Sequence, residues 1–360
     1  MHILMKKRVF GLGLGFVFLL SLVVACSQRA AQGGFDACPA DSLTGEKVAL
    51  SDSVWMRYPY RVRVSGSVAV VFDLNADSCF CHLFSYPDFR FIASFAPKGE
   101  GPEEVVSASM GRFIDKTHFG VLDMSGRKLL VYDDLNARSV PRLSQVIPFE
   151  ESVSLPLEFL PLPDSTLLIP DYLGEARFCI ADRSGRLLKK TGSITLADTV
   201  ALRDNAPAVA QAWRSFLAID EAGKRVAAVT QLGDVLDTYA LQGEMAAEAH
   251  SIGPDGEPVF QVTPEGYGIP VGCMGYWDVQ VTDSCIYTLY DGTKFKDIMQ
   301  SPDGNRQGGA LLRVFSREGK PLHSYQLGRQ LSGIYVDEAR RTLWAIDVNT
   351  DNGLYRYLLK

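Results

Sequence analysis

The feature that most constrains the fold is a unit of short, β-rich runs that recurs along the chain. One instance is FGVLDM, KLLVYD and LSQVIPF between residues 119 and 149, and another is CIYTLYDG, ALLRVFS and PLHSYQL between residues 285 and 327. Short apolar runs separated by Gly, Asp, Asn and Pro are typical of β-strands. No long stretch has helical periodicity, and the nearest one, from Ala206 to Phe216, predicts only one or two inserted helical turns. The sequence therefore predicts an all-β fold.

The spacing of these units identifies the architecture. The ends of the central runs lie 48, 49, 59, 75 and 42 residues apart, at Phe84, Tyr132, Ala181, Ala240, Phe315 and Tyr357. Periods of about 40 to 50 residues with about four strands each are typical of β-propellers. We therefore predict a six-bladed β-propeller with four-stranded blades. The longest interval contains a polar run from Thr293 to Gly309, which predicts an inserted surface loop.

The last unit is one strand short. Three β-like runs, at residues 331–336, 342–346 and 354–359, precede the C-terminal Lys360. An open strand edge invites aggregation, so another segment is expected to cover it. The segment from Glu46 to Met56 is the one unassigned β-like stretch before the first unit. We predict that it forms the outer strand of blade six and closes the ring, which gives a propeller domain over residues 46–360.

The N-terminus has the pattern of an export signal. Three basic residues at positions 6–8 precede an uncharged run over residues 9–25, as in secretory signal peptides. The run ends in Val-Val-Ala-Cys, which resembles the lipobox of bacterial lipoproteins, whose cysteine receives diacylglycerol. We predict a signal peptide over residues 1–25, and the lipidated Cys26 with a flexible tether over residues 26–45. The alternative, an uncleaved membrane anchor, is disfavoured by three glycines within the run.

Charge and the residues after Cys26 bear on location and partners. Removal of the first 25 residues would leave 33 basic residues against 42 acidic ones. Nucleic-acid binding needs a basic face, so we predict no nucleic-acid partner. Surface-exported lipoproteins of some Gram-negative lineages carry an acidic run just after the lipidated cysteine, and none follows Cys26. We expect a lipid-anchored protein of the bacterial outer membrane that faces the periplasm.

Several stretches of the chain carry a resemblance to a known family. One is FAPKGEGPEE at residues 95–104, which has the form of a Gly-x-Gly-Pro-x-Glu loop. The others are YWDVQVTDSCIYTLYDG at residues 276–292 and the runs at 311–327 and 331–346. In these features the chain resembles the TolB-like six-bladed propeller lipoproteins of bacterial envelopes. The resemblance implies a fold and a location in the cell envelope, and it implies no catalytic motif.

The glycine-rich stretch after the first unit is a candidate ligand loop. Gly99 and Gly101 would let the backbone approach a ligand, and Glu103 and Glu104 offer carboxylates for a cation. The alternative is a turn between two blades, in which the glycines supply positive φ angles. We favour the turn and keep these four residues as candidate ligand groups.

No complete catalytic or metal-binding motif is found, and we predict no cofactor and no metal. The five histidines show no HExxH or HxH spacing. Residues 347–353 have oxygen-bearing side chains at alternate positions, but they lack the Gly and Glu that an EF-hand loop requires, so we predict a hairpin turn. Export permits disulfides, and if one bridge forms we favour Cys273 with Cys285.

These patterns lead to one functional hypothesis and two alternatives. We predict a lipid-anchored, non-catalytic propeller that binds a protein or a glycan through the loops at one end of its central channel. The first alternative is a propeller hydrolase or lactonase-like enzyme with a metal on the axis, and the second is a structural envelope component. Convergence of acidic residues on the axis would favour the enzyme. The aspartates to test for convergence are Asp123, Asp182, Asp283 and Asp347.

Overall fold

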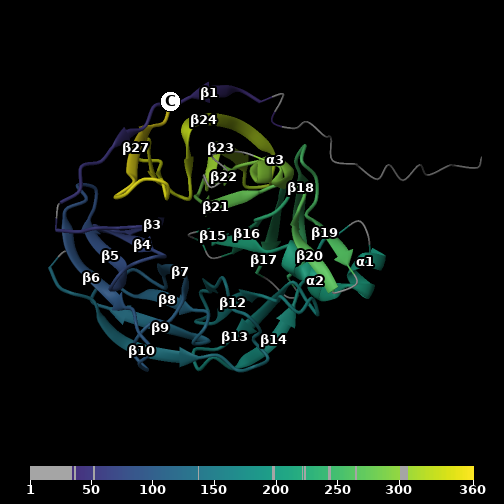
Figure 1. Ribbon diagram of the computed structural model, residues 1–360, viewed down its shortest axis with the longest axis horizontal. Helices are drawn as coiled ribbons and strands as arrows, with labels where there is room; N and C mark the ends of the chain where they lie inside the picture. Colours follow the sequence, from purple (N-terminus) through teal and green to yellow (C-terminus); the bar gives the residue numbers. More distant parts are fainter. Residues whose placement is uncertain are drawn as a thin grey trace, which may run out of the picture. The chain divides into compact units, whose positions relative to one another are not determined.

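The computed structural model confirms the six-bladed propeller. It describes Phe35 and residues 38–51, 53–136, 138–196, 199–220, 222, 224–241, 245–263, 266–300 and 307–360. Over these residues the sheets are arranged around a central axis, and each blade has at least four strands (Figure 1). The predicted signal peptide, Cys26 and most of the predicted tether lie outside the described residues.

In each blade the strands follow one another from the axis to the rim in chain order. Blade one contains β3 (Pro59–Ser65), β4 (Val68–Asp73), β5 (Cys79–Ser85) and β6 (Phe91–Pro97). Blade two contains β7 (Ala108–Phe113), β8 (Phe119–Asp123), β9 (Lys128–Asp133) and β10 (Arg142–Pro148). Blade three contains β11 (Leu160–Pro161), β12 (Leu167–Pro170), β13 (Phe178–Ala181) and β14 (Leu187–Thr191). Blade four contains β15 (Ser215–Ile219), β16 (Arg225–Thr230), β17 (Val235–Ala240) and β18 (Ala247–Ile252). Blade five contains β21 (Tyr276–Val281), β22 (Cys285–Tyr290), β23 (Gly309–Ser316) and β24 (Pro321–Leu331). Blade six contains β25 (Gly333–Asp337), β26 (Thr342–Ile346) and β27 (Leu354–Leu358).

The second strands of the blades are apolar on both faces. Every residue of β4 (VAVVFD) and β8 (FGVLD) is buried, whereas β10 (RLSQVIP) on the rim is mostly exposed or half-buried. Each blade packs between two neighbours, so its middle strands meet an apolar surface on either side. This arrangement explains why these strands appear in the sequence as continuous apolar runs rather than as alternating ones.

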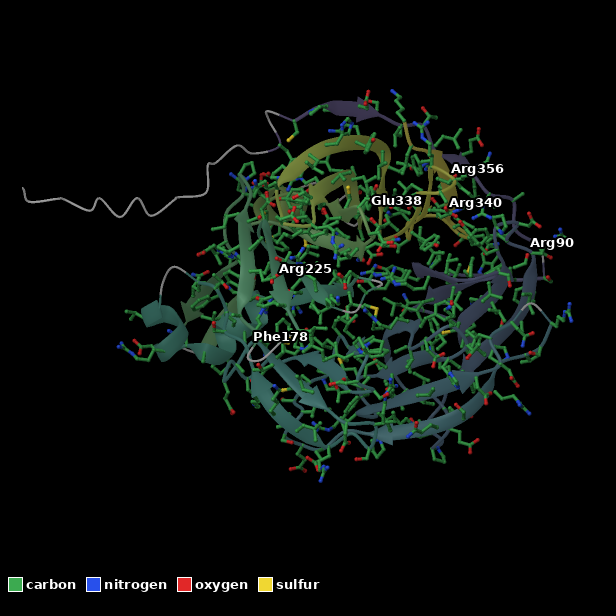
Figure 2. The ribbon with its side chains drawn as sticks, turned by 180° about the vertical axis from the view of Figure 1, so that it is seen from behind. Arg90, Phe178, Arg225, Glu338, Arg340 and Arg356 are labelled. Atoms are coloured by element: carbon green, nitrogen blue, oxygen red, sulfur yellow. The ribbon has the colours of Figure 1, made fainter. Side chains whose placement is uncertain are left out.

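The ring is closed by an N-terminal strand in blade six, as predicted. The strand β2 (Glu46–Lys47) pairs antiparallel with β27, and Arg356 Nη2 donates to Glu46 Oε2 at 2.7 Å; Arg356 is labelled on this blade in Figure 2. β2 is shorter than the predicted segment. Val54 and Met56 make no strand and are instead buried between blades six and one.

A second N-terminal strand corrects the predicted tether. β1 (Ala40–Ser42) runs parallel to β24 and makes blade five a five-stranded sheet. Leu43 is buried, and a Cβ at Gly45 would lie 2.4 Å from the Tyr357 ring. Residues 40–45 therefore belong to the propeller. Their short polar sequence carries no strand signal, because an edge strand on the rim needs no apolar face.

The longest interval between units contains two insertions rather than the single predicted one. A hairpin of β19 (Val259–Thr263) and β20 (Gly266–Val271) follows blade four, and α3 (Phe295–Gln300) lies within the predicted polar loop. The predicted helical turns from Ala206 to Phe216 are confirmed over α2 (Ala206–Ala212), but Phe216 belongs to β15 and a further helix, α1 (Thr199–Asp204), precedes the predicted range. Among the residues that the structure describes, no helix is long and apolar enough to cross a membrane.

The strand directions give the ring two different ends. In every blade, the loop between the second and third strands and the connection to the next blade lie at the same end. We call this end the insertion end, because α1, α2, the β19–β20 hairpin and α3 all belong to its loops. The remaining loops of each blade lie at the other end, which we call the opposite end.

Polar contacts join neighbouring blades at the opposite end, where Figure 2 labels three of the side chains. Arg225 of blade four donates to a backbone carbonyl in the β23–β24 turn of blade five at 3.2 Å. Glu338 of blade six accepts a hydrogen bond from Tyr287 of blade five at 2.9 Å. The guanidinium of Arg340 lies 5.5 Å from the ring centroid of Tyr86 in blade one. The opposite end is thus bound together by its own polar groups.

Candidate binding site on the propeller axis

Five charged side chains come together on the propeller axis. Arg61 and Arg63 project from β3, Arg112 from β7 and Asp278 from β21, while Glu158 lies two residues before β11. All except Arg63 are at most 7% exposed, and Arg63 is largely buried. The innermost strands of several blades meet here, so residues far apart in the sequence form one axial cluster.

Each carboxylate of the axial cluster is held by an arginine. Arg63 makes two hydrogen bonds to Asp278, at 2.9 and 2.8 Å, and Arg112 makes one to Glu158 at 2.8 Å. Burial would raise the pKa of Asp278, but Arg63 and Arg61 outweigh it and hold that pKa below its ordinary value. For Glu158 burial prevails over Arg112, and the pKa is raised. Three guanidinium groups face two carboxylates, which leaves one positive charge in excess.

Arg61 shares the carboxylate of Asp278, with its Nε 3.6 Å from Asp278 Oδ1. Its Nη1 and Nη2 donate to the main-chain carbonyls of Ser332 and Trp277, in blades six and five. The guanidinium carbon lies 3.8 Å from the ring centroid of Tyr60 and 4.5 Å from that of Phe216. Arg61 thus links blades one, five and six, and it is stacked between two aromatic rings.

An aromatic pocket of about 270 Å³ lies next to Arg61 at the insertion end. Its lining combines five aromatic rings, two amides and two apolar side chains: Tyr58, Tyr60, Phe216, Tyr276, Trp277, Gln231, Gln307, Leu74 and Met274. Two of these rings, Tyr60 and Phe216, are the ones that stack on the Arg61 guanidinium. The pocket therefore has an apolar, aromatic wall with a cation behind it.

The C-terminal end of the polar insertion is fixed beside this pocket. Tyr58 donates its hydroxyl hydrogen to the amide oxygen of Gln307. The Gln307 backbone N–H donates to Asn349 Oδ1 at 3.0 Å, and Asn349 Nδ2 donates to the Gln307 carbonyl at 2.8 Å. Blades one and six thereby hold one wall of the pocket in place.

The candidate ligand loop has the hydrogen bonding of a turn between blades one and two. The Gly101 N–H donates to Glu104 Oε2 at 2.9 Å, and a Cβ at Gly99 would lie 1.9 Å from the same oxygen. Glu103 is exposed, and none of the four residues lines the axial pocket. A role of Gly99, Gly101, Glu103 and Glu104 as ligand groups stays a prediction, and the carboxylate of Glu104 is already engaged by its own loop.

The four aspartates considered for an axial metal do not converge. Asp182 and Asp283 lie in turns at the opposite end, whereas Asp123 and Asp347 lie at the insertion end. The latter two belong to a set that recurs at the end of the second strand or in the loop that follows it in each blade: Asp73, Asp123, Asp171, Asp234, Asp291 and Asp347. Asp123, for example, accepts hydrogen bonds from the backbone N–H groups of Val106 and Ser107 at 3.1 and 3.0 Å. We therefore assign Asp123 to bracing of the blade connection.

The favoured disulfide is not formed. Cys273 and Cys285 are free, as are the other four cysteines among the described residues. Cys273 lies just before β21, and Cys285 starts β22, so the two residues sit at opposite ends of this strand pair. The described residues also contain no group of three or more His, Cys, Asp or Glu side chains arranged to bind a metal ion.

The axial residues were not identified from the sequence, although a signal for them exists. The run YRVRVSG places Arg61 and Arg63 at alternate positions of an otherwise apolar strand, and YWDVQV places Asp278 in another. Alternate positions on a strand face the same side. A charged residue within the innermost strand of a blade is thus the pattern that marks the axis.

Comparison with known proteins agrees with this architecture. Residues 40–339 match the family described as TolB-like 6-blade propeller-like. The chain belongs to this family. No curated protein matches it.

Two solved structures are similar to this TolB-like propeller. One is described as an exported protein of Bacteroides fragilis NCTC 9343, with 12% identity, a TM-score of 0.53, and coverage of 89% of this chain and 98% of that one. The other is a member of the DUF4221 family from Bacteroides vulgatus ATCC 8482, with 10% identity, a TM-score of 0.57 and the same coverage. At such identities the likeness shows the fold alone.

Proposed function

We propose that this TolB-like propeller is a non-catalytic binding protein of the cell envelope that docks a protein partner at its insertion end. The observation that carries the proposal is the position of the exposed apolar side chains. Of the twelve large ones among the described residues, eight belong to the insertion end: Trp55, Val106, Leu155, Leu173, Val200, Ile252, Val259 and Met299. We call these eight residues the apolar rim. Trp55 is 62% exposed and Met299 is 87% exposed.

The apolar rim and the aromatic pocket together have the composition of a protein interface. Such interfaces combine aromatic residues and Met at their centre with pockets that receive anchor side chains. Exposed apolar side chains that lie together mark interaction sites on soluble proteins, and the apolar rim supplies such side chains from successive loops at one end of the ring. Burial of aliphatic side chains such as Val106 and Leu155 against other apolar groups is favourable in free energy. Contact with a sugar would instead place hydroxyl groups against these side chains. The rim therefore favours a protein over a glycan as the ligand.

The state of the axial carboxylates favours binding over catalysis. A metal-dependent propeller enzyme needs axial carboxylates that are free to ligate, and Asp278 and Glu158 each already bind an arginine. The raised pKa of Glu158 is a feature that would suit acid–base chemistry. Turnover of a lactone or an ester by the purified protein, abolished in Glu158→Gln, would therefore contradict the proposal.

The docking proposal is tested by photo-crosslinking in cells. A photoreactive amino acid at Val106 or at Met299 is expected to form adducts with one partner protein. The matched controls are Leu188 and Leu322, which are exposed to a similar degree as Val106 but lie on outer strands of blades three and five. Adducts of equal yield from both pairs of positions, or none from the insertion end, would count against the proposal. A glycan ligand would instead show as retention on a polysaccharide that Trp277→Ala abolishes.

A lipid anchor at Cys26 belongs to the same proposal. The Val-Val-Ala-Cys sequence supports it, and Phe35 packs on Phe315 at 4.9 Å, near the end of β23 at the opposite end of the ring.

Anchoring is tested by substitution of the cysteine. The Cys26→Ser variant is expected to lose most of its membrane-bound fraction, because each buried methylene of an acyl chain contributes about 0.8 kcal/mol to membrane binding. Cell fractionation measures this, with Cys38→Ser as the matched control that should stay on the membrane. Wild-type retention and processing of Cys26→Ser would rule out the lipobox.

A further inference from the structure

The loops at the two ends of the ring carry opposite excesses of exposed charge. In the described loops and inserted helices of the insertion end, the exposed acidic residues are Asp77, Glu100, Glu103, Glu150, Glu151, Glu175, Asp204, Asp297 and Asp351. The exposed basic residues there are Arg57, Lys98, Arg203 and Lys296. The described loops of the opposite end reverse this balance, with Asp88, Asp115, Asp164, Asp283 and Glu318 against Arg90, Lys116, Arg138, Arg186, Lys224, Lys320, Arg340 and Arg341.

Ion pairing within the insertion end leaves its surface acidic. The half-buried groups of the same loops do not offset the excess, since Glu104, Asp255, Glu257 and Asp291 stand against Arg127, Arg214 and Lys294. Two of the four exposed cations are already paired, Arg57 with Asp77 at 2.9 Å and Arg203 with Asp204 at 2.7 Å. Five exposed carboxylates make no hydrogen bond or ion pair with any residue that the structure describes: Glu100, Glu103, Glu151, Asp297 and Asp351.

Three of these unpartnered carboxylates lie beside members of the apolar rim in the chain. The neighbours are Glu103 with Val106, Glu151 with Leu155, and Asp297 with Met299. The first two pairs lie in connections between successive blades, and the third lies in α3. A partner that covers the rim therefore also approaches these carboxylates. They would lose hydration without compensation unless the partner brings opposite charges.

We infer that the partner covers the apolar rim with a basic surface, in which Lys and Arg side chains surround apolar ones. The inference rests on the proposed docking function and adds the chemistry of the partner. The docking surface is the apolar rim, and the carboxylates between its members determine the charge of what covers it. Complementary charge of this kind speeds association and excludes partners of the wrong sign.

The same observations disfavour two other surfaces that could cover exposed apolar side chains. A lipid surface with anionic headgroups would repel the unpartnered carboxylates. The opposite end of a second copy has the required charge, but among its described loops Val140 is the one large exposed apolar side chain. It would therefore cover the rim mainly with polar groups. A different protein that combines basic and apolar side chains meets both requirements.

The test measures the binding of two peptide probes to the purified full-length protein by fluorescence anisotropy. Both probes are amphipathic helical peptides with Leu on one face, and the other face carries Lys in the first probe and Gln in the second. We expect the Lys peptide to bind about tenfold tighter, because several exposed charge contacts add to the shared apolar contact. The preference should shrink in high salt, since the screening length falls to about 3 Å at 1 M ionic strength.

Two charge-matched variants locate the effect on the surface. In the triple variant Glu103→Gln, Glu151→Gln, Asp297→Asn the preference for Lys should fall below about threefold. The matched control, Asp88→Asn, Asp283→Asn, Glu318→Gln, removes the same charge from exposed positions of the opposite end and should retain the full preference. All substituted side chains are exposed, so thermal unfolding of both variants should match that of the wild type.

The outcomes separate this inference from the docking function. Equal binding of the two peptides, a preference for Gln, or failure of both to bind overturns the basic partner. A preference for Lys that falls equally in both variants overturns it as well, because the charge of the whole protein then accounts for the binding. In the photo-crosslinking experiment, adducts at Val106 with a segment that lacks an excess of Lys and Arg, or with a second copy of this chain, overturn the basic partner alone. An absence of adducts overturns the docking function and the inference together.

Discussion

A chain that lacks residues 27–56 is expected to lose several kcal/mol of unfolding free energy or to fail to fold. The deletion removes β1 and β2, and with them the outer strands of blades five and six. It also removes Met56 and Val54, which are buried between blades six and one. Truncation of one buried Met to Ala costs about 2–5 kcal/mol, and whole proteins are stable by about 5–15 kcal/mol. Urea and thermal unfolding measure the loss.

Two shorter deletions provide the controls for this result. Removal of residues 27–34 leaves Phe35 and both N-terminal strands in place, so the midpoint of unfolding should stay unchanged. Removal of residues 27–45 takes away β1 and the buried Leu43 but keeps β2, and an intermediate loss is expected. If the longest deletion melts at the same temperature as the shortest one, the ring does not depend on closure by its N-terminal segment.

Substitution of Asp278 is expected to have the second large effect. In Asp278→Ala the guanidinium groups of Arg63 and Arg61 remain on the axis without their carboxylate, and the Ile334 N–H loses its acceptor. Removal of one partner of a buried ion pair costs about 3–5 kcal/mol. Asp283→Ala, in an exposed turn of the same hairpin, is the matched control and should change stability by less than about 0.5 kcal/mol. Equal effects of the two substitutions in urea unfolding would contradict the buried pairing.

The pH dependence of stability gives a second readout for the same residue. Because the pKa of Asp278 is lowered in the folded protein, its contribution is fully present above the unfolded-state pKa of about 3.9 and is lost as the pH falls through the folded-state value. The wild-type protein should therefore lose stability more steeply below about pH 4 than Asp278→Asn does. Parallel curves for the two proteins would show that this carboxylate does not titrate with folding.

The fold could be predicted from the sequence because a propeller is built locally. Each blade is a run of consecutive strands, so its length appears directly as the spacing between Phe84, Tyr132 and the later landmarks. The closure by Glu46–Lys47 followed from the missing strand of blade six. The strand Ala40–Ser42 could not be predicted in this way, since three polar residues on a rim need no apolar pattern.

The candidate site was much harder to predict, because it forms between blades rather than within one. Arg63 and Asp278 are 215 positions apart in the sequence and meet only when the ring closes. The pocket takes Tyr60, Phe216 and Trp277 from three different blades. No local spacing encodes such a meeting. The sequence shows only that charged residues occupy innermost strands, and the register of all six blades around the axis determines which of them become neighbours.

The pairing of the N-terminal strands with the last two blades has a topological consequence. The C-terminal residue lies beside β1, near the start of the described chain, since Lys360 Nζ is 3.3 Å from Asp41 Oδ1. Domains whose termini are adjacent at the surface tolerate circular permutation. The ring thus has no obligatory first blade: a chain that began between β10 and β11 and ran through a short link from Lys360 to the present N-terminal segment would form the same sheets in the same order. In this architecture the arrangement of the axial residues does not depend on which blade the chain begins with.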